Sequence, residues 1–412
     1  MTATTLKNRT ILISGASVAG PALAYWLSRY GFKPSIVEKA SGLREGGYAI
    51  DIRGAAQKVA ERMGIKSDLQ QAHTQMQGMI YVDKNSKPLA HISPEMMAGG
   101  GDPDIEFLRG DLTRLLYNMT KDSTEYIWGD SITSCTEQAD GVLVTFERSQ
   151  PRTVDLVVGA DGVHSNVRAR VFGEEPQFTR ELGYYVAIFT TANHLNLQYQ
   201  ELIYRMPGKV AGMYSARQNT EVKALFYFTA PQAGFERLSS DEQKQILADH
   251  YAGEGWEIPT LLEGMWHASD FYFDSLTLVQ MDSWSKGRVV LVGDAGYCAT
   301  PLSGQGTSLA LVGAYVLAGE LAVANGDYQS AFATYEKEMQ EYVTLNQKIG
   351  ADNGKMLVPP THSQIWFNTQ LIRMLPYMPW KGAILKEIRK PYDAITLKNY
   401  ESVLLQAHAT HG

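Results

Sequence analysis

Residues 10–39 constrain the fold of this 412-residue chain more than any other segment. A β-branched run from Thr10 to Ser14 leads into the glycine turn GASVAG at 15–20. A helix-like stretch to Tyr30 and a second strand-like run at 33–39 follow. A strand, a tight turn, a helix and a second strand within about thirty residues are typical of a dinucleotide-binding fold. We therefore expect an α/β chain with a Rossmann-like domain at its N-terminal end.

The glycine turn has the chemistry to hold a pyrophosphate. Gly15 permits the tight bend, Gly20 permits close helix packing, and the helix N-terminus offers free N–H groups and a positive dipole. Glu38 follows at roughly the 20-residue spacing at which a carboxylate reaches an adenosine ribose. Ser17 departs from the fingerprint, because it places a β-carbon where the phosphates approach. From this motif alone, a strand-turn-helix unit without a ligand remains an open alternative.

Two later segments add chemistry of the same kind. Residues 155–168, DLVVGADGVHSNVR, run from an apolar strand into a glycine turn that contains Asp161 and Gly162. In residues 288–310 another strand delivers Asp294 at its carboxyl end, and a loop rich in Pro and Gly then opens a helix. Such an Asp can accept hydrogen bonds from ribityl hydroxyls, and the helix start can hold a ring that gains negative charge. Taken singly, each segment is a turn before a helix.

Together and in this order, the three motifs resemble the class A flavoprotein monooxygenases. This FAD-dependent hydroxylase family is typified by para-hydroxybenzoate hydroxylase, and the resemblance covers nearly the whole chain. It implies a GR2-type flavoprotein with non-covalent FAD. It also implies that Arg53 in DIRG and Arg109 in RGDL contact the cofactor. For either arginine, a surface salt bridge is the alternative. The implied FAD-binding residues are Gly15, Ala16, Ser17, Ala19, Gly20, Glu38, Lys39, Arg53, Arg109, Asp161, Gly162, Asp294, Pro301, Gly304, Gly306, Thr307 and Ser308.

Within that family, the chain is most similar to the tetracycline-inactivating flavin monooxygenases, the tetracycline destructases. The spellings GGYAIDIRG, FLRGDLTRLL and GDAGYC carry this similarity, together with the long helical tail. Actinobacterial polyketide hydroxylases share the same spellings. Two departures are Tyr297, where a His is frequent after GDA, and Ser308, where an Asn often follows GQG.

The resemblance implies that NADPH or NADH reduces FAD and that dioxygen supplies the oxygen atom that hydroxylates an aromatic or polyketide substrate. The flavin carries this chemistry, so no protein residue is assigned as catalytic. Only one dinucleotide fingerprint is present, so we expect NAD(P)H to bind transiently. The open alternatives are an NAD-dependent dehydrogenase, a flavin-binding protein without turnover, and a flavin-dependent oxidoreductase of polyketide or secondary metabolism that inactivates no antibiotic.

The composition changes near Gly173, after which aromatic and small residues alternate between Pro and Gly. This pattern predicts an antiparallel substrate sheet inserted into a discontinuous FAD-binding domain. The expected FAD-binding segments are 1–80, 105–172 and 284–345, the substrate domain is 81–104 and 173–283, and a helical extension covers 346–412. The candidate pocket residues are Tyr185, Phe189, Arg205, Met213 and Phe226, for which ordinary core is the alternative. The helical tail is expected to be either a gate for substrate or a stabilising buttress.

Composition and charge exclude several other classes. Hydrophobic residues make up 44% and charged residues 20%, which fits a soluble globular protein. A net charge of −7 gives little support for a nucleic-acid partner. Cys135 and Cys298 form no CxxC pair, so we expect no metal site and a reducing, cytoplasmic location. The uncharged stretch 295–319 contains Pro301 and five glycines, which favours a loop and a buried helix over a membrane span. We expect a monomer or weak dimer.

Overall fold

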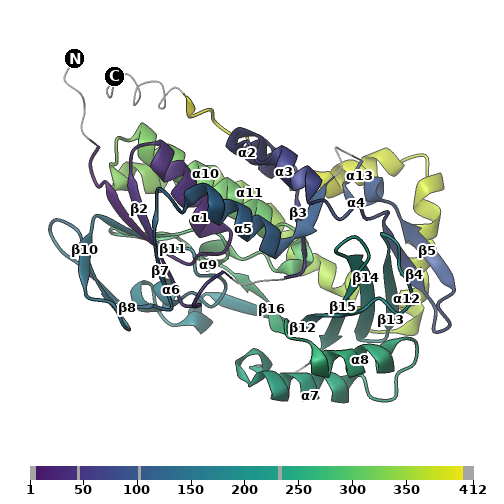
Figure 1. The fold of residues 1–412 in the computed structure, drawn as a ribbon. Coiled ribbons are helices and arrows are strands. Elements are labelled where there is room, and N and C mark those ends of the chain that lie inside the picture. The colour runs from purple at the N-terminus through teal and green to yellow at the C-terminus, as the bar shows by residue number, and fades with distance from the viewer. Residues whose placement is uncertain (1–5, 44–46, 101–103, 231–233, 402–412) are drawn as a thin grey trace.

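The computed structural model describes residues 6–43, 47–100, 104–230 and 234–401. Figure 1 shows two connected regions, one with long helices beside a sheet and one built on a second, curved sheet. The helices near the C-terminal end of the chain, drawn in yellow, lie at the right of this view. The last part of the predicted helical extension, 402–412, lies outside the described residues.

The first region contains a six-stranded sheet. In spatial order its strands are β17 (Ser285–Lys286), β18 (Val289–Leu291), β11 (Leu156–Gly159), β1 (Thr10–Ser14), β2 (Lys33–Glu38) and β7 (Glu125–Trp128). Neighbouring strands are parallel except β17 and β18. The central strands are short apolar runs because helices cover both faces of a parallel sheet. The expected Rossmann-like α/β fold is confirmed.

Long helices flank this sheet. They are α1 (Ala19–Arg29), α2 (Ala55–Met63), α3 (Lys66–Gln71), α5 (Arg109–Thr120), α10 (Gly306–Val323) and α11 (Tyr328–Leu357). α10 has the length and composition of a membrane-crossing helix, but 83% of its 18 residues are buried. It packs against α1, α2 and α11 in the protein core, which explains why it is apolar on every side (Figure 1).

Two smaller sheets and several short helices complete the fold. β3 (Ala49–Ile52) pairs with β6 (Ile105–Leu108), and β8 (Ile132–Glu137), β9 (Val142–Phe146) and β10 (Arg152–Val154) form a three-stranded sheet. Short helical turns follow the glycine motifs. They are α6 (Asn166–Val171), η1 (Glu175–Gln177), α9 (Asp294–Tyr297) and η3 (Pro301–Ser303).

The second region contains a seven-stranded sheet. In spatial order its strands are β16 (Tyr272–Val279), β12 (Thr179–Ala192), β15 (Glu221–Thr229), β14 (Lys209–Ala216), β13 (Glu201–Met206), β4 (Met79–Val82) and β5 (Pro88–Ile92). α7 (Ser240–His250) and α8 (Ile258–His267) cover one of its faces, whereas η2 (Phe235–Arg237) and α4 (Pro94–Met97) lie beside it. Its strands come from two separate segments of the chain. The predicted domain boundaries around them stay predictions.

The C-terminal segment lies against both regions. α12 (His362–Met374) packs on β5 and β13, and η4 (Leu375–Tyr377) and α13 (Lys381–Arg389) follow. The chain then returns to the first region, where the Tyr400 hydroxyl donates to Oε1 of Glu320 at 2.7 Å. α11 is one continuous helix that passes through residue 346, the predicted start of the extension, and ends at Leu357. The domain boundary at residue 346 stays a prediction.

Candidate functional site

The three glycine motifs predicted from the sequence meet at the carboxyl ends of the parallel strands. Gly15 has a φ of +110°, and a β-carbon there would overlap the carbonyl oxygen of Ala160. A β-carbon at Gly20 would overlap the carbonyl oxygen of Gly15. The side chain of Ala19 lies 3.3 Å from the position that a β-carbon of Gly293 would take. The turns after β1, β11 and β18 are therefore close together, as their motifs predict.

Two long helices begin at these motifs without a side-chain cap. α1 begins after Val18 and α10 begins after Gln305, and neither first turn contains an acidic residue. Within the described parts of the chain, no side chain caps either helix. The N–H groups of a first helical turn have no partner inside the helix, and the helix dipole is positive there. Both N-termini, including Thr307 and Ser308 of α10, are suited to an anionic or electron-rich group.

Glu38 lies at the carboxyl end of β2 and faces the first turn. Its Oε2 accepts a hydrogen bond from the N–H of Ala16 at 2.8 Å, and its Oε1 accepts one from Ala40 at 2.9 Å. These bonds fix the carboxylate beside the turn, while each oxygen can still accept a hydroxyl. Lys39 follows directly and is exposed.

Asp161 organises the second turn. Its carboxylate accepts hydrogen bonds from Oγ of Ser165 at 2.5 Å and from the N–H of Val167 at 3.1 Å, with Oγ of Ser14 at 3.3 Å. Burial raises the pKa of Asp161 and these hydrogen bonds oppose the shift. No described atom lies within 4 Å of the place where a side chain of Gly162 would begin. The turn is thus anchored by Asp161 and open at Gly162.

Arg109 connects the first and third motifs. Its Nη2 donates a hydrogen bond to Oγ of Ser17 at 2.7 Å, and its guanidinium lies 5.8 Å from the ring centroid of Tyr48. Burial lowers the pKa of Arg109, but Tyr48, Tyr272 and Asp294 together raise it above its ordinary value. The residue therefore keeps a positive charge beside the N-terminus of α1. Ser17, which departs from the glycine fingerprint, accepts the hydrogen bond that holds this arginine.

Asp294 begins α9 directly after the third strand motif. Burial raises the pKa of Asp294, and the charge of Arg109 opposes the shift. The thiol of Cys298 forms a hydrogen bond with this carboxylate. Oδ1 of Asp294 lies 3.9 Å from the position of a β-carbon at Gly306, the first residue of α10. The GD motif and the GQG loop therefore form one surface.

Arg53 holds the GQG loop from the other side. Its Nη2 and Nε form ion pairs of 2.8 Å with Asp51 and Asp104, and its backbone N–H donates to Oγ of Ser308 at 3.2 Å. Gly304, after the turn that begins at Pro301, has a φ of +62°, and a β-carbon there would lie 2.9 Å from Nη1 of Arg53. Burial raises the pKa of Asp104 to about 6, although Arg53 opposes the shift.

One face of the seven-stranded sheet carries a row of tyrosines directed toward the first region. The strand register places Tyr184, Tyr214, Tyr227 and Tyr272 on this face. The ring of Tyr272 lies 5.3 Å from that of Tyr48, and the Tyr214 hydroxyl accepts a hydrogen bond from the N–H of Ala49 at 2.9 Å. We call Tyr184, Tyr214, Tyr227 and Tyr272 the tyrosine face.

Four of the five predicted pocket residues lie on the opposite face. Their side chains are fully buried against α7 and α8, and they are Tyr185, Phe189, Met213 and Phe226. The prediction that these four residues line the pocket is therefore wrong. Neighbouring residues of a strand point to opposite faces of the sheet, so a shift of one residue places the side chain on the other face. Arg205 lies on the side of the tyrosine face, with its guanidinium 3.9 Å from the ring centroid of Tyr81.

Two glutamates near the tyrosine face were not found from the sequence. Burial and the charge of Asp51 raise the pKa of Glu106 to about 8 and that of Glu201 to about 7. Thr74 donates a hydrogen bond to Glu106. Glu201 pairs across the sheet with Tyr214, one of the tyrosine face. These residues stand outside every sequence motif, so only the strand pairing reveals them.

The sequence profile of the FAD binding domain family matches residues 8–347. The chain belongs to this family. A flavin-dependent monooxygenase of Legionella longbeachae is 41% identical over 344 residues, which cover 84% of this chain and 88% of that relative. Solved structures of the tetracycline destructases Tet(51) and Tet(55) are 37% and 38% identical, with a TM-score of 0.82 for both. They match 95% and 97% of this chain and all of their own length. The chain is a flavin-dependent monooxygenase.

The geometry of the monooxygenase fits FAD, its cofactor. Two uncapped helix N-termini and the charge of Arg109 suit the pyrophosphate and the electron-rich edge of a flavin. Open space at Gly162 and next to Gly306 leaves room for a ligand between the motifs. Glu38 and Asp294 are the carboxylates that the sequence predicts as acceptors for ribose and ribityl hydroxyls. The role of each of these residues toward FAD stays a prediction.

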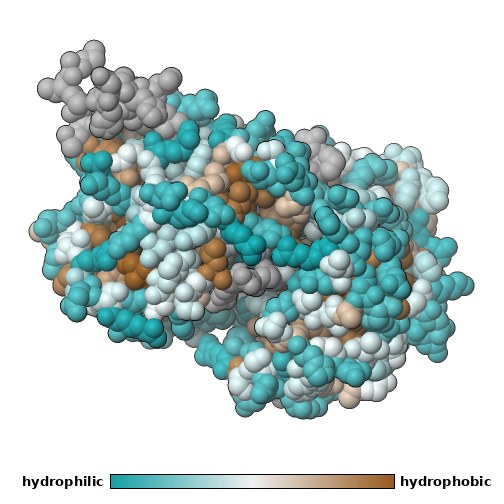
Figure 2. All heavy atoms as spheres, viewed as in Figure 1, coloured by the Kyte–Doolittle hydropathy of each residue, from teal (hydrophilic) through white to brown (hydrophobic). Residues whose placement is uncertain are grey.

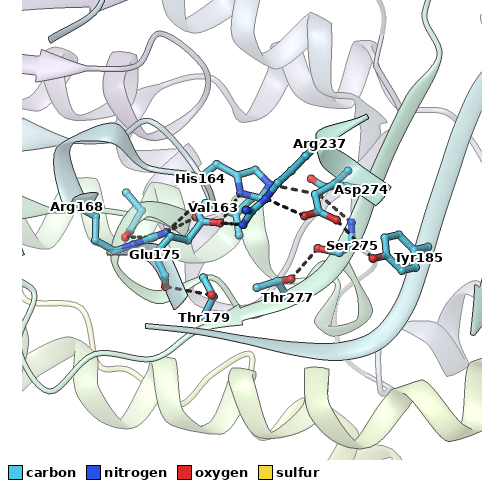
Figure 3. Close-up of polar contacts among 12 residues, drawn as sticks. Val163, His164, Arg168, Glu175, Thr179, Tyr185, Arg237, Asp274, Ser275 and Thr277 are labelled. Carbon is cyan, nitrogen blue, oxygen red and sulfur yellow. Dashed lines mark hydrogen bonds and ion pairs between the residues drawn. The ribbon is translucent and has the colours of Figure 1, made fainter. Parts of the chain in front are cut away.

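A polar cluster joins the turn after β11 to η1 and to strand β16 of the seven-stranded sheet (Figure 3). Nδ1 of His164 lies 3.1 Å from Oε1 of Glu175, and its Nε2 lies 3.5 Å from Oδ1 of Asp274. Arg168 is fully buried and donates to the carbonyl of Ala295 at 2.9 Å. A cavity of about 440 Å³ lies here, lined by His164, Glu174, Glu175, Pro176, Glu236 and Arg237.

Among the described residues, the thiols and histidines have no metal-binding arrangement. Burial raises the pKa of Cys135 to about 11 and raises that of Cys298 well above its ordinary value, so both thiols stay protonated. Across the described residues, no group of three His, Cys, Asp or Glu side chains is placed to hold a metal ion. The monooxygenase site is therefore built from backbone N–H groups, arginines, carboxyls and phenols.

Proposed function

We propose that this monooxygenase uses NADPH or NADH and dioxygen to hydroxylate an aromatic or polyketide compound in the cytoplasm, with tetracyclines as the first candidates. The similarity to solved tetracycline destructases over their whole length supports this choice of candidate. A dehydrogenase that uses NAD alone does not agree with the flavin-dependent relatives or with the FAD-binding family.

The tyrosine face is the observation that carries the substrate proposal. Its phenol rings come from four strands, and the ring of Tyr272 lies 5.3 Å from that of Tyr48, which is itself beside Arg109. Aromatic rings stack on planar apolar rings, and phenol hydroxyls exchange hydrogen bonds with ring oxygens. A flat, polyoxygenated, fused-ring compound matches this surface better than an aliphatic one.

Glu106 and Glu201 are candidate hydrogen-bond donors to the substrate. Burial and the charge of Asp51 raise the pKa of both carboxyls, which favours their protonated forms. A protonated carboxyl donates to a carbonyl or enol oxygen, which orients the ring that reacts. When bound, FAD supplies the redox and oxygen-transfer chemistry, and these side chains position the substrate and exclude water.

The test is incubation of the FAD-loaded protein with a tetracycline, a polyketide phenol and an aliphatic ketone of similar size, with NADPH and separately NADH. Mass spectrometry should detect one added oxygen atom in a fused-ring compound, and the substitution Tyr227→Leu should raise its KM. Tyr328→Leu, on the first turn of α11, is the matched control and should leave KM unchanged. Oxidation of the aliphatic ketone alone, or equal effects of both substitutions, would contradict the proposal.

A growth assay separates the two biological readings of the same chemistry. Bacteria that express the enzyme should survive a tetracycline concentration that kills the parent strain if the hydroxylated product is inactive. Survival equal to that of the parent, with product formed, would instead favour the polyketide hydroxylase of secondary metabolism.

A further inference from the structure

The largest group of exposed apolar side chains on this protein lies outside the FAD site. Large hydrophobic residues with exposed side chains number twelve in the described parts of the chain, and six of them fall within residues 366–380. These six are Trp366, Phe367, Leu371, Met374, Tyr377 and Trp380. We call them the aromatic patch. Concentrated exposed apolar surface of this kind marks an interaction site.

The patch is held on a fixed support. α12 buries Thr369 and Ile372, and Oγ1 of Thr369 accepts a hydrogen bond from Nη2 of Arg205 at 2.6 Å. Phe367, Leu371 and Met374 therefore share another side of the helix, at the spacing i, i+4, i+7.

The turn after α12 carries two more exposed aromatic rings. Tyr377 is 88% exposed and Trp380 is 60% exposed, while α13 is anchored by the buried Leu385, which contacts Gly100. Figure 1 places α12 and α13 at one end of the molecule. The face drawn in Figure 2 is mainly teal and white, with brown side chains in small separate groups.

The charge of this segment differs from that of the rest of the chain. Residues 361–390 contain five basic residues and one acidic residue, a net charge of +4 in a chain of net charge −7. Lys381 and Arg389 pair with Glu95 and Asp393. The other three basic residues are Arg373, Lys386 and Lys390; all are exposed, and they form no ion pair with the described carboxylates. Exposed aromatic and basic side chains therefore occur together.

We infer that α12, η4 and α13 form a docking surface for an anionic phospholipid membrane. Trp and Tyr side chains favour the headgroup level of a bilayer, where the ring is in apolar surroundings and the polar atom is in water. Lys and Arg beside them are attracted to anionic headgroups. The basic charge disfavours a symmetric second copy on this patch, because the same positive surface would face itself. The protein would lie on the membrane without crossing it, since α10 is part of the core.

Flotation of the FAD-loaded protein with vesicles tests the inference. Vesicles of phosphatidylcholine with an equal amount of phosphatidylglycerol should carry the protein, and phosphatidylcholine alone should carry much less. The double substitution Lys386→Glu with Lys390→Glu should weaken binding by about tenfold or more, because each basic residue near an anionic surface contributes measurably to affinity. Lys33→Glu with Lys121→Glu, on exposed positions elsewhere, is the control and should bind like wild type.

The apolar part of the surface is tested by Tyr377→Ser with Trp380→Ser, and Trp266→Ser on α8 is its control. The first pair should lose vesicle binding and keep bound FAD and NAD(P)H oxidation. In case that pair folds poorly, quenching of wild-type tryptophan fluorescence by brominated lipid gives an independent measurement. Absence of binding to anionic vesicles overturns the inference. Unchanged binding in both Lys386→Glu with Lys390→Glu and Tyr377→Ser with Trp380→Ser also overturns it. A third contrary result is a wild-type protein that is a dimer and becomes monomeric in Tyr377→Ser with Trp380→Ser.

Discussion

Nη2 of Arg109 donates a hydrogen bond to Oγ of Ser17 across 2.7 Å. The arginine begins α5 and the serine lies in the first glycine turn, so this bond joins two segments that are 92 residues apart in the sequence. The serine stands where the usual fingerprint has a glycine, and a glycine could not accept this hydrogen bond. The hydroxyl fixes a positive charge at the N-terminus of α1.

Replacing Arg109 by methionine should weaken FAD binding. The substitution removes the positive charge that we expect to bind the cofactor. Charge-assisted hydrogen bonds are worth roughly 1.5 to 3 kcal/mol, so the Kd for FAD should rise by about ten- to a hundredfold. Titration of the apoprotein with FAD, followed by flavin fluorescence, measures the change. Arg114→Met, exposed on the same helix, is the control and should leave Kd as it is.

Glu38→Ala should also weaken FAD binding by about ten- to a hundredfold, because its carboxylate is predicted to accept the adenosine ribose. The same substitution removes the acceptors of the Ala16 and Ala40 N–H groups. AMP as a competing ligand separates the two effects. If the carboxylate binds the adenosine end, AMP should compete with FAD in the wild type and poorly in Glu38→Ala. Equal competition in both proteins would place the adenosine elsewhere.

The stability of the protein should fall in alkaline solution through His164. A hydrogen bond with Asp274 raises the pKa of His164 to about 9, burial opposes the shift, and Glu175 adds to it. Because the folded-state pKa lies above the unfolded value of about 6.5, the stabilisation is complete below that pH and is lost as the pH rises through about 9. The Tm difference between wild type and His164→Gln should therefore be larger at pH 6 than at pH 10. His267→Gln is the control, and a difference independent of pH contradicts the assignment.

Tyr400→Ala should destabilise the whole fold. The ring lies where a β-carbon of Gly319 would be, and its hydroxyl donates to the buried Glu320. Removing a buried aromatic side chain costs about 3 kcal/mol or more. Urea denaturation measures the free energy of unfolding, and Tyr377→Ala, at an exposed position, should change it by less than about 0.5 kcal/mol.

This prediction decides part of the question about the tail. A chain that ends before residue 359 would lose Tyr400 and also Tyr392, whose ring lies 5.4 Å from the guanidinium of Arg53. We therefore expect that truncation to lower both stability and FAD binding, which is the buttress outcome. Retained stability and FAD binding, with poor coupling of NAD(P)H oxidation to hydroxylation, would favour a gate.

The sequence predicted the parts of this protein that depend on local chain geometry. The glycine turns, Glu38 and Asp294 lie at strand ends, because a strand followed by a glycine and a helix has few ways to fold. Ser239 and Glu242 form the capping box that their spacing predicts. The order of these motifs along the chain carried the resemblance to the FAD-dependent hydroxylases, which implied the FAD-binding fold.

The pocket could not be predicted in the same way. Strand β12 carries apolar side chains on both faces. The alternation of side chains along the strand therefore does not indicate which face α7 and α8 cover. Phe189 and Phe226 were therefore assigned to the pocket, whereas they lie in the core. Glu106 and Glu201 come together through the packing of separate strands, and their raised pKa values arise from burial that no local pattern contains.

The central claim is that this chain is an oxygen-transferring enzyme whose FAD lies between the three glycine motifs. The most direct measurement supplies isotopically labelled dioxygen to the FAD-loaded protein with NADPH and the fused-ring substrate, and determines the label in the product by mass spectrometry. We expect one labelled oxygen atom in the product of the wild type and a matching loss of product when Arg109→Met is assayed at limiting FAD. Product that carries oxygen from water, or product formed equally by protein freed of FAD, would contradict it.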